Sequence, residues 1–201
     1  MQAAAAGQFS IRVLGIDPAA AGATGYAVVD AKGANCTSVH FDTIAAASSA
    51  SANASMRLRQ IHSRIADLIE EYAPQCLAIE SIFAALNIGT ALRLAEVRGV
   101  ILLAAAQHEI PVHSYSPREV KAAIAGYGNA DKMQLQHMVR VHLSLKEIPQ
   151  PADASDALAV ALCHIYAARN DAKFGADAKL LAAPRSARRK PAALPRILSV
   201  R

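Results

Sequence analysis

The sequence has little of what disulfide-stabilised or membrane-spanning proteins require. It contains no Trp, 4% aromatic residues and three cysteines, none of which belongs to a C-x-x-C pair. Neither a disulfide framework nor a zinc ribbon is therefore indicated, and we interpret Cys36, Cys76 and Cys163 as reduced, buried thiols. No apolar run reaches the roughly 18 residues needed to span a bilayer, because the longest, at 99–107, is too short. We expect no membrane partner.

Targeting signals and acidic residues are also scarce. The start "MQAAAAGQFS" lacks the basic region of a secretory signal and the Arg-rich character of a transit peptide, so the cytoplasm is the expected location. Asp and Glu number 16 against 21 Lys and Arg, and much of the resulting net charge of +5 lies in the segment 184–201. A basic balance is typical of proteins with polyanionic partners.

The sequence is instead rich in aliphatic residues, which can form one hydrophobic core. With 201 residues and 53% hydrophobic content, it is long enough for a single domain. We predict a flexible N-terminal extension over 1–9, a domain over 10–170 and a basic, flexible tail over 171–201, because no core-like periodicity continues beyond Asn170. The tail is interpreted either as an arm that contacts DNA phosphates or as an aid to solubility.

Alternating patterns predict an α/β fold with a mixed, five-stranded sheet and helices on both faces. Ser116 as N-cap, Pro117 and Glu119 form a capping box that predicts a helix ending near Gly126. Low complexity predicts a loop over 45–55. The predicted strands are 10–17, 24–30, 38–44, 76–80 and 112–115. The predicted helices are 56–72, 88–108, 117–126, 131–145 and 151–169.

Two predicted buried strands end on a carboxylate. Asp17 follows "VLGI" and Glu80 follows "CLAI". Because neighbouring parallel strands bring their C-terminal ends to one edge of a sheet, we expect these acids to lie side by side. Asp153 and Asp156 are three residues apart at the start of a helix and therefore share the face of its first turn. Taken alone, they could equally be a helix cap and a solvated acid.

Four carboxylates in one pocket repel one another unless cations balance them. Carboxylate oxygens suit Mg²⁺ or Mn²⁺, and two such ions about 3.5–4 Å apart can drive phosphodiester hydrolysis. The histidines offer no comparable pattern, because none belongs to an H-E-x-x-H motif. We interpret the seven histidines as hydrogen-bonded or solvated.

The motifs together resemble the RuvC Holliday-junction resolvase family over residues 11–168. They are "GIDP…TGYAVV", "AIESIF", "SPREVKAAIAGYGNADKMQLQHMV" and "DASDALAVALCH". The resemblance implies a ribonuclease H-like fold, a homodimer, four-way junction DNA as substrate, two Mg²⁺ or Mn²⁺ ions per site and an associated branch-migration motor. It also implies that the catalytic, metal-binding acids are Asp17, Glu80, Asp153 and Asp156.

Three further positions follow from the resemblance. Phe83 in "ESIF" would stack at the junction centre, and Lys121 and Lys132 would lie near the DNA backbone. Without the resemblance, Phe83 is an ordinary core residue and the lysines are solvated charges.

The loop 18–23 departs from the family pattern. It has Ala19 where the family commonly has Gly, contains no basic residue and is one residue longer. This departure keeps open a junction-binding protein with impaired catalysis. An actin-like or sugar-kinase ATPase could also begin with an acid and a small-residue loop, but the chain is too short for the second domain of those folds.

Overall fold

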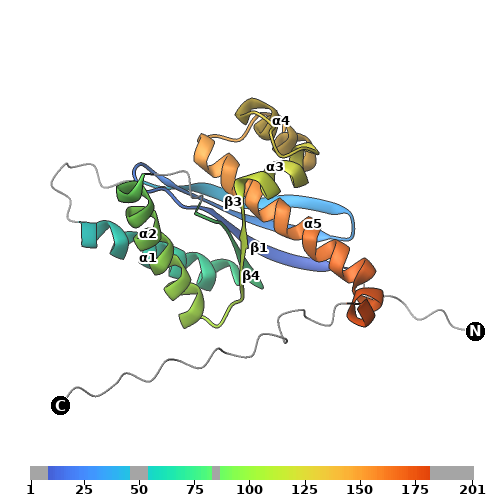
Figure 1. Cartoon of the computed structure of the whole chain (residues 1–201), viewed down its shortest axis with the longest axis horizontal. Helices are drawn as coiled ribbons and strands as arrows, with labels where there is room; N and C mark the ends of the chain where they lie inside the picture. Colours follow the sequence, from blue (N-terminus) through green and yellow to red (C-terminus); the bar gives the residue numbers. More distant parts are fainter. Residues whose placement is uncertain (1–8, 46–53, 83–86, 182–201) are drawn as a thin grey trace, which may run out of the picture.

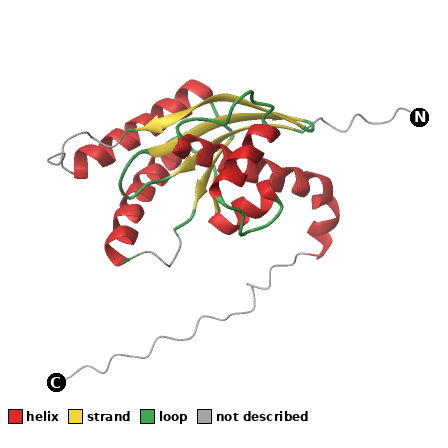
Figure 2. Ribbon diagram, turned by 90° about the horizontal axis from the view of Figure 1, so that it is seen from above, coloured by secondary structure: helices red, strands yellow, loops and turns green. Residues whose placement is uncertain are grey.

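A computed structural model of the chain describes residues 9–45, 54–82 and 87–181. It contains one five-stranded sheet of order β3-β2-β1-β4-β5, and helices cover both faces of this sheet (Figures 1 and 2). The strands are β1 (Ser10–Asp17), β2 (Thr24–Lys32), β3 (Asn35–Ile44), β4 (Cys76–Glu80) and β5 (Val112–Tyr115). The helices are α1 (Ala54–Tyr72), α2 (Ile88–Gln107), α3 (Pro117–Ala125), α4 (Lys132–His142) and α5 (Ala152–Leu181).

The first three strands form an antiparallel meander, and the last two join the sheet in parallel. β2 pairs antiparallel with both β1 and β3, whereas β4 runs parallel to β1 and to β5. The parallel pairings require the crossovers that α1 and α2 provide. The predicted mixed α/β sheet with helices on both faces is therefore confirmed.

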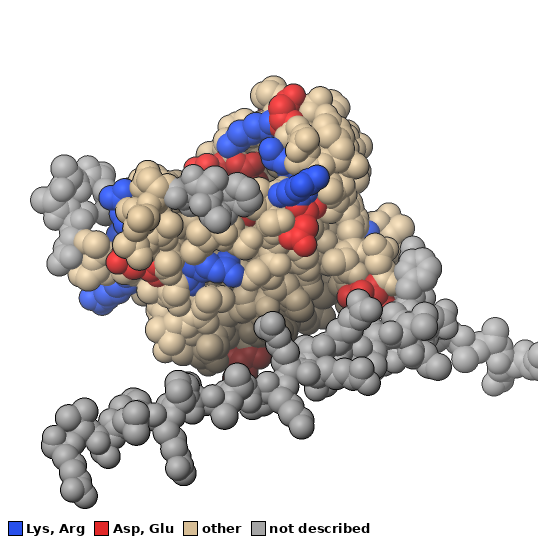
Figure 3. Space-filling view, in the orientation of Figure 1, with Lys and Arg blue, Asp and Glu red and all other residues tan. Residues whose placement is uncertain are grey.

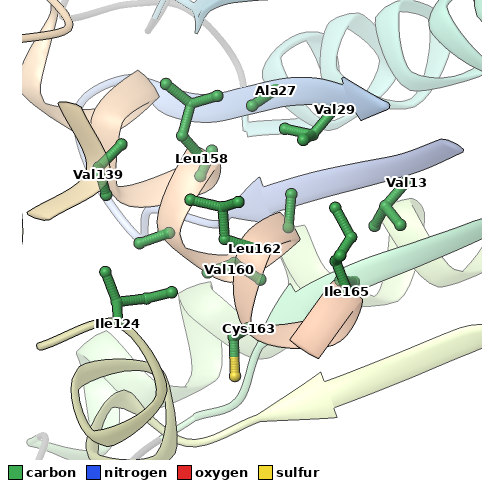
Figure 4. Packing of buried hydrophobic residues seen from close by; sticks show 14 of the residues in the cluster. Val13, Ala27, Val29, Ile124, Val139, Leu158, Val160, Leu162, Cys163 and Ile165 are labelled. Carbon is green, nitrogen blue, oxygen red and sulfur yellow. The ribbon is translucent and has the colours of Figure 1, made fainter. Parts of the chain in front are cut away.

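Two hydrophobic clusters hold the three layers together. Ile61, Ile65 and Leu68 of α1 pack with α2 against one face of the sheet. On the other face lies the buried first half of α5, and Figure 4 shows its Leu158 beside Ala27 of β2. The smaller helices α3 and α4 complete that second cluster. Burial of these aliphatic side chains supplies about 1.5–3 kcal/mol each.

The structure contains the helix-end signals that the sequence predicts for α3. The Ser116 side chain accepts from the backbone N–H of Glu119, and Gly126 ends α3 in the left-handed conformation with φ 86°. Glycine tolerates this conformation without the steric cost that a Cβ would impose. The helix predicted to reach residue 145 ends instead at His142, because Ser144 turns the chain with φ 51°.

The last helix is longer than the sequence pattern predicts. We expected it to end at Arg169, but α5 continues to Leu181, so the first part of the predicted tail, 171–181, is helical. The sequence there is rich in Ala and Lys, which favour helix, and a helix extending past the core needs no buried stripe.

The interpretation of the three cysteines as buried thiols also needs one correction. All three are free, and Cys76 and Cys163 are buried, but Cys36 is only partly buried. It lies on β3, an edge strand, where its Sγ is 3.2 Å from Arg169 Nη2. An edge strand has a neighbour on one side only, which leaves this thiol less covered than the other two.

Some predictions fall on residues outside those that the structure describes. These are Phe83, most of the extension 1–9, most of the loop 45–55 and the end of the tail beyond 181. The domain limits stay a prediction. Among the described helices, none is both long and apolar enough to cross a membrane.

Candidate active site

The site begins where two parallel strands end side by side. Asp17 is the last residue of β1 and Glu80 is the last residue of β4. The preceding residues, Ile16 and Ile79, are partners in the β1–β4 pairing. The pairing register therefore brings the two acids to the same edge of the sheet, as the strand patterns predict.

The first turn of α5 adds two more acids because glycine lets the helix approach the sheet closely. Gly25 is paired with Asp17 across β1 and β2. A Cβ built on Gly25 would lie only 1.9 Å from the backbone oxygen of Asp153. With glycine in place, ligand oxygens of Asp17, Asp153 and Asp156 all lie within 4.8 Å of one another.

These acids open into a mixed-charge cavity of about 210 Å³. Asp17, Glu80 and Asp156 line it together with Lys121 and Lys132. Figure 3 shows Lys and Arg side chains beside Asp and Glu side chains on the face seen in Figure 1. A larger cavity of about 450 Å³, bordered by α3 and α4, has no carboxylate among the described residues that line it and cannot offer the same chemistry.

Burial and mutual repulsion raise the pKa of two of the acids. Burial, followed by repulsion from Glu80, Asp156 and Asp153, raises the pKa of Asp17 to about 8. Burial and then Asp156 raise the pKa of Glu80 to about 7. A nearby divalent cation stabilises the ionised form of such carboxylates. A set of ligands made only of oxygen atoms matches Mg²⁺ or Mn²⁺. The residues present therefore fit such ions.

Both predicted lysines lie at the cavity. Lys132 Nζ is 2.9 Å from Asp156 Oδ2, and this contact raises the pKa of Lys132. The positive charge of Lys121 lowers the pKa of Glu80 and so opposes the effect of burial on that carboxyl group. Each lysine thus provides positive charge next to one of the acids.

Sequence reasoning did not identify two arginines that support the site. The Arg57 guanidinium of α1 donates to the carbonyl oxygens of Ala19 and Ala20, at 2.7 and 2.8 Å, in the loop after Asp17. Arg98 Nη1 of α2 donates to the Glu80 carbonyl at 2.7 Å. Arg98 stands in an otherwise apolar stretch, "VRGVILL", which is the one signal that could have identified it.

Comparisons with known proteins agree on one family. The family described as "Crossover junction endodeoxyribonuclease RuvC" matches residues 13–164. A relative of that name from Chloroflexus aurantiacus is 44% identical over 165 residues, covering 82% of this chain and 99% of its own. One from a Roseiflexus species is 46% identical over 157 residues, covering 78% and 92%.

Solved structures give the same answer. Thermus thermophilus RuvC in complex with Holliday junction substrate has a TM-score of 0.75 and 35% identity, covering 81% of this chain and 97% of its own. The yeast mitochondrial resolvase Ydc2, at 12% identity and a TM-score of 0.61, shares the fold and covers 85% of this chain and 86% of its own. By its sequence, its fold and its strand-end acids, the chain belongs to the RuvC family of crossover junction endodeoxyribonucleases.

Proposed function

We propose that this protein resolves four-way (Holliday) DNA junctions by paired, symmetric nicks during recombination and repair. The observation that carries this proposal is the convergence of Asp17, Asp153 and Asp156 within 4.8 Å, with Glu80 lining the same cavity. The Thermus relative, solved with a Holliday junction, supports the choice of substrate.

The four acids would hold two divalent cations, Mg²⁺ or Mn²⁺. Such ions activate water for in-line attack and stabilise the leaving oxygen of a phosphodiester. Asp17 and Glu80, fixed at adjacent strand ends, and Asp153 and Asp156, at the start of α5, would supply the oxygen ligands. The helix N-terminus behind Asp153 favours the ionised carboxylates.

The chain's own cations would position the DNA. Lys132 now pairs with Asp156, and we expect it to exchange that partner for a phosphate oxygen when Asp156 serves as a metal ligand. Lys121, beside Glu80 in the same cavity, would contact the backbone in the same way. Phe83 would stack on a base at the junction centre.

Paired cutting needs two active sites, and α2 carries a surface suited to a second copy. Its exposed residues recur at intervals of three or four and form one apolar stripe. Gly99 leaves open space at the middle of the stripe, so two helices can approach closely. We define the α2 stripe as Ile88, Leu92, Ala95, Gly99, Leu102, Leu103 and Ala106. A symmetric dimer through this stripe would bury it.

The proposed substrate also indicates the cellular location and a partner protein. An enzyme that acts on recombining DNA would work in the cytoplasm, and a branch-migration motor would be its partner at the junction. Both statements rest on the family to which the chain belongs.

The deciding experiment compares a synthetic four-way junction with a linear duplex of the same sequence. We expect Mg²⁺-dependent, symmetric nicks in the junction alone and no cutting with chelator. Asp156→Asn should lower the cleavage rate by orders of magnitude while junction binding persists. The matched control is Asp67→Asn, an exposed acid on α1, which should cut normally. Binding by the wild-type chain without metal-dependent cutting would favour the alternative, a catalytically impaired junction-binding protein.

A further inference from the structure

A second group of metal-ligating side chains lies apart from the acids. Cys76 of β4, His113 of β5 and His164 of α5 each offer a ligand atom, and these atoms lie within 4.8 Å of one another. None of the three belongs to the carboxylate group around Asp17. Two of them, Cys76 and His164, are buried.

Strand register explains why these residues meet. His113 is paired with Ala78, and Cys76 is two residues earlier on β4, so both side chains lie on the same face of the sheet. Helix α5 covers this face and contributes His164. Cys76 and His113 are therefore diagonal neighbours across the β4–β5 pair.

A hydrogen bond prepares His164 to act as a ligand. Its Nδ1 is 2.7 Å from the hydroxyl oxygen of Tyr115, a residue on the same face of β5 as His113. When Nδ1–H donates to Tyr115, the lone pair of Nε2 remains available. Metal-binding histidines are oriented in this way by an acceptor on their other ring nitrogen.

The protonation state of His164 suits a metal that binds neutral imidazole, whereas the Cys76 thiol must lose its proton to become a ligand. Burial, and then nearby His113, lower the pKa of His164 to about 4, so its ring is neutral near pH 7. The His113 and His164 rings are stacked, with centroids 4.2 Å apart and planes 28° apart, so their in-plane lone pairs run nearly parallel and one ring must rotate before both nitrogens face one cation. Burial raises the pKa of Cys76 to about 12, so a metal must displace its proton.

From this geometry we propose that Cys76, His113 and His164 form a structural site for a thiophilic divalent cation such as Zn²⁺. One thiolate and two imidazoles are zinc ligands, whereas Mg²⁺ prefers oxygen. Binding forms one S–Zn bond and two N–Zn bonds and releases the Cys76 proton to solvent, and water fills the fourth position. Neighbouring ligand atoms in a tetrahedral zinc site lie about 3.3–3.8 Å apart, so binding requires closure by about 1.5 Å or less together with rotation of one imidazole ring.

The consequence of such a site is a cross-link between three elements. It would tie the edge strand β5 to β4 and α5. β4 carries Glu80 at its end, and α5 carries Asp153 and Asp156 in its first turns. The cation would therefore stabilise the frame that holds the acids without contacting DNA.

The test is a Co²⁺ titration of the metal-free full chain in excess Mg²⁺, followed by absorption. Thiolate-to-cobalt charge transfer reports on sulfur ligation, which the carboxylate site cannot produce. We expect the band in the wild-type chain and its loss in Cys76→Ser. Cys163→Ser, which changes another buried thiol, should keep the band. Tyr115→Phe should weaken Co²⁺ affinity by about 10–100-fold.

A second variant guards against misfolding of Cys76→Ser. His113→Gln changes an edge-strand residue and should weaken Co²⁺ binding while circular dichroism stays unchanged. No charge-transfer band in the folded wild-type chain, or a band that Cys163→Ser removes and Cys76→Ser does not, overturns the proposal. Because the readout uses no DNA, its failure is separate from failure of the nuclease proposal.

Discussion

At the scale of single residues, the raised pKa of Asp17 predicts that the stability of the chelated protein depends on pH. Its pKa of about 8 and that of Glu80, about 7, lie above the ordinary values of 3.8 and 4.5. A raised folded-state pKa means that the folded chain binds protons where the unfolded chain is ionised. Stability is therefore greatest below pH ~4 as far as these groups are concerned, and falls as pH rises through about 8.

We expect the unfolding free energy of the chelated protein to decrease as pH rises from about 5 to about 8. Mg²⁺ should remove much of this decrease. Asp17→Asn should stabilise the chelated protein near pH 8, on the order of a few kcal/mol, because one pKa unit corresponds to about 1.4 kcal/mol. Urea unfolding across pH measures both effects, and Asp67→Asn is the control. A pH-independent difference between Asp17→Asn and the wild type would contradict this electrostatic account.

Arg98 links the α2 helix to the edge of the sheet that carries the candidate active site. It donates to the Glu80 carbonyl and, through Nη2, to Ser114 Oγ at 2.5 Å. Lysine keeps the charge but cannot donate to both oxygens in this forked geometry. We predict that Arg98→Lys lowers the single-turnover cleavage rate by roughly 10–100-fold, with little change in junction affinity. Arg93→Lys, an exposed change on the same helix, is the control, and an Arg98→Lys enzyme with the wild-type rate would show that Glu80 needs no such support.

At the scale of elements, the close approach of α5 to the sheet sets the acid geometry. An added methyl at Gly25 must displace the Asp153 backbone, since the Cβ would lie 1.9 Å from its oxygen. We predict that Gly25→Ala lowers the unfolding free energy by about 1–3 kcal/mol and impairs cleavage. In Gly89→Ala the nearest atom, Asn87 Oδ1, is 3.6 Å away, so denaturation and cleavage should match the wild type. Equal behaviour of the two variants would argue against close packing as the cause.

The same elements show what local sequence can and cannot predict. Strand periodicity and the Ser116 capping box are local, and each predicted its element. The meeting of Asp17 with Glu80 was also predictable, because parallel neighbours end at one edge. The support from Arg98 depends on tertiary contacts between distant segments, and the Cys76–His113 proximity depends on the β4–β5 register. No spacing within the sequence specifies either of them.

At the scale of the whole molecule, the α2 stripe should decide the oligomeric state. Leu103 is 51% exposed within the stripe, and Val141, on α4, is 49% exposed outside it. A carboxylate buried in a dimer interface without a partner is strongly unfavourable. Leu103→Asp should therefore produce monomers, whereas Val141→Asp, with the same change in charge at similar exposure, should remain dimeric. Light scattering after size-exclusion chromatography measures both masses.

The loss of the dimer should also change the reaction. A monomer retains Asp17, Glu80, Asp153 and Asp156 but presents only one set of acids to a four-way junction. We therefore expect Leu103→Asp to convert paired nicks on a supercoiled cruciform plasmid into uncoupled single nicks, because the first cut relaxes the cruciform before a second monomer acts. If Leu103→Asp remains a dimer and still linearises the plasmid, the subunits meet through another surface and the α2 stripe has a different partner.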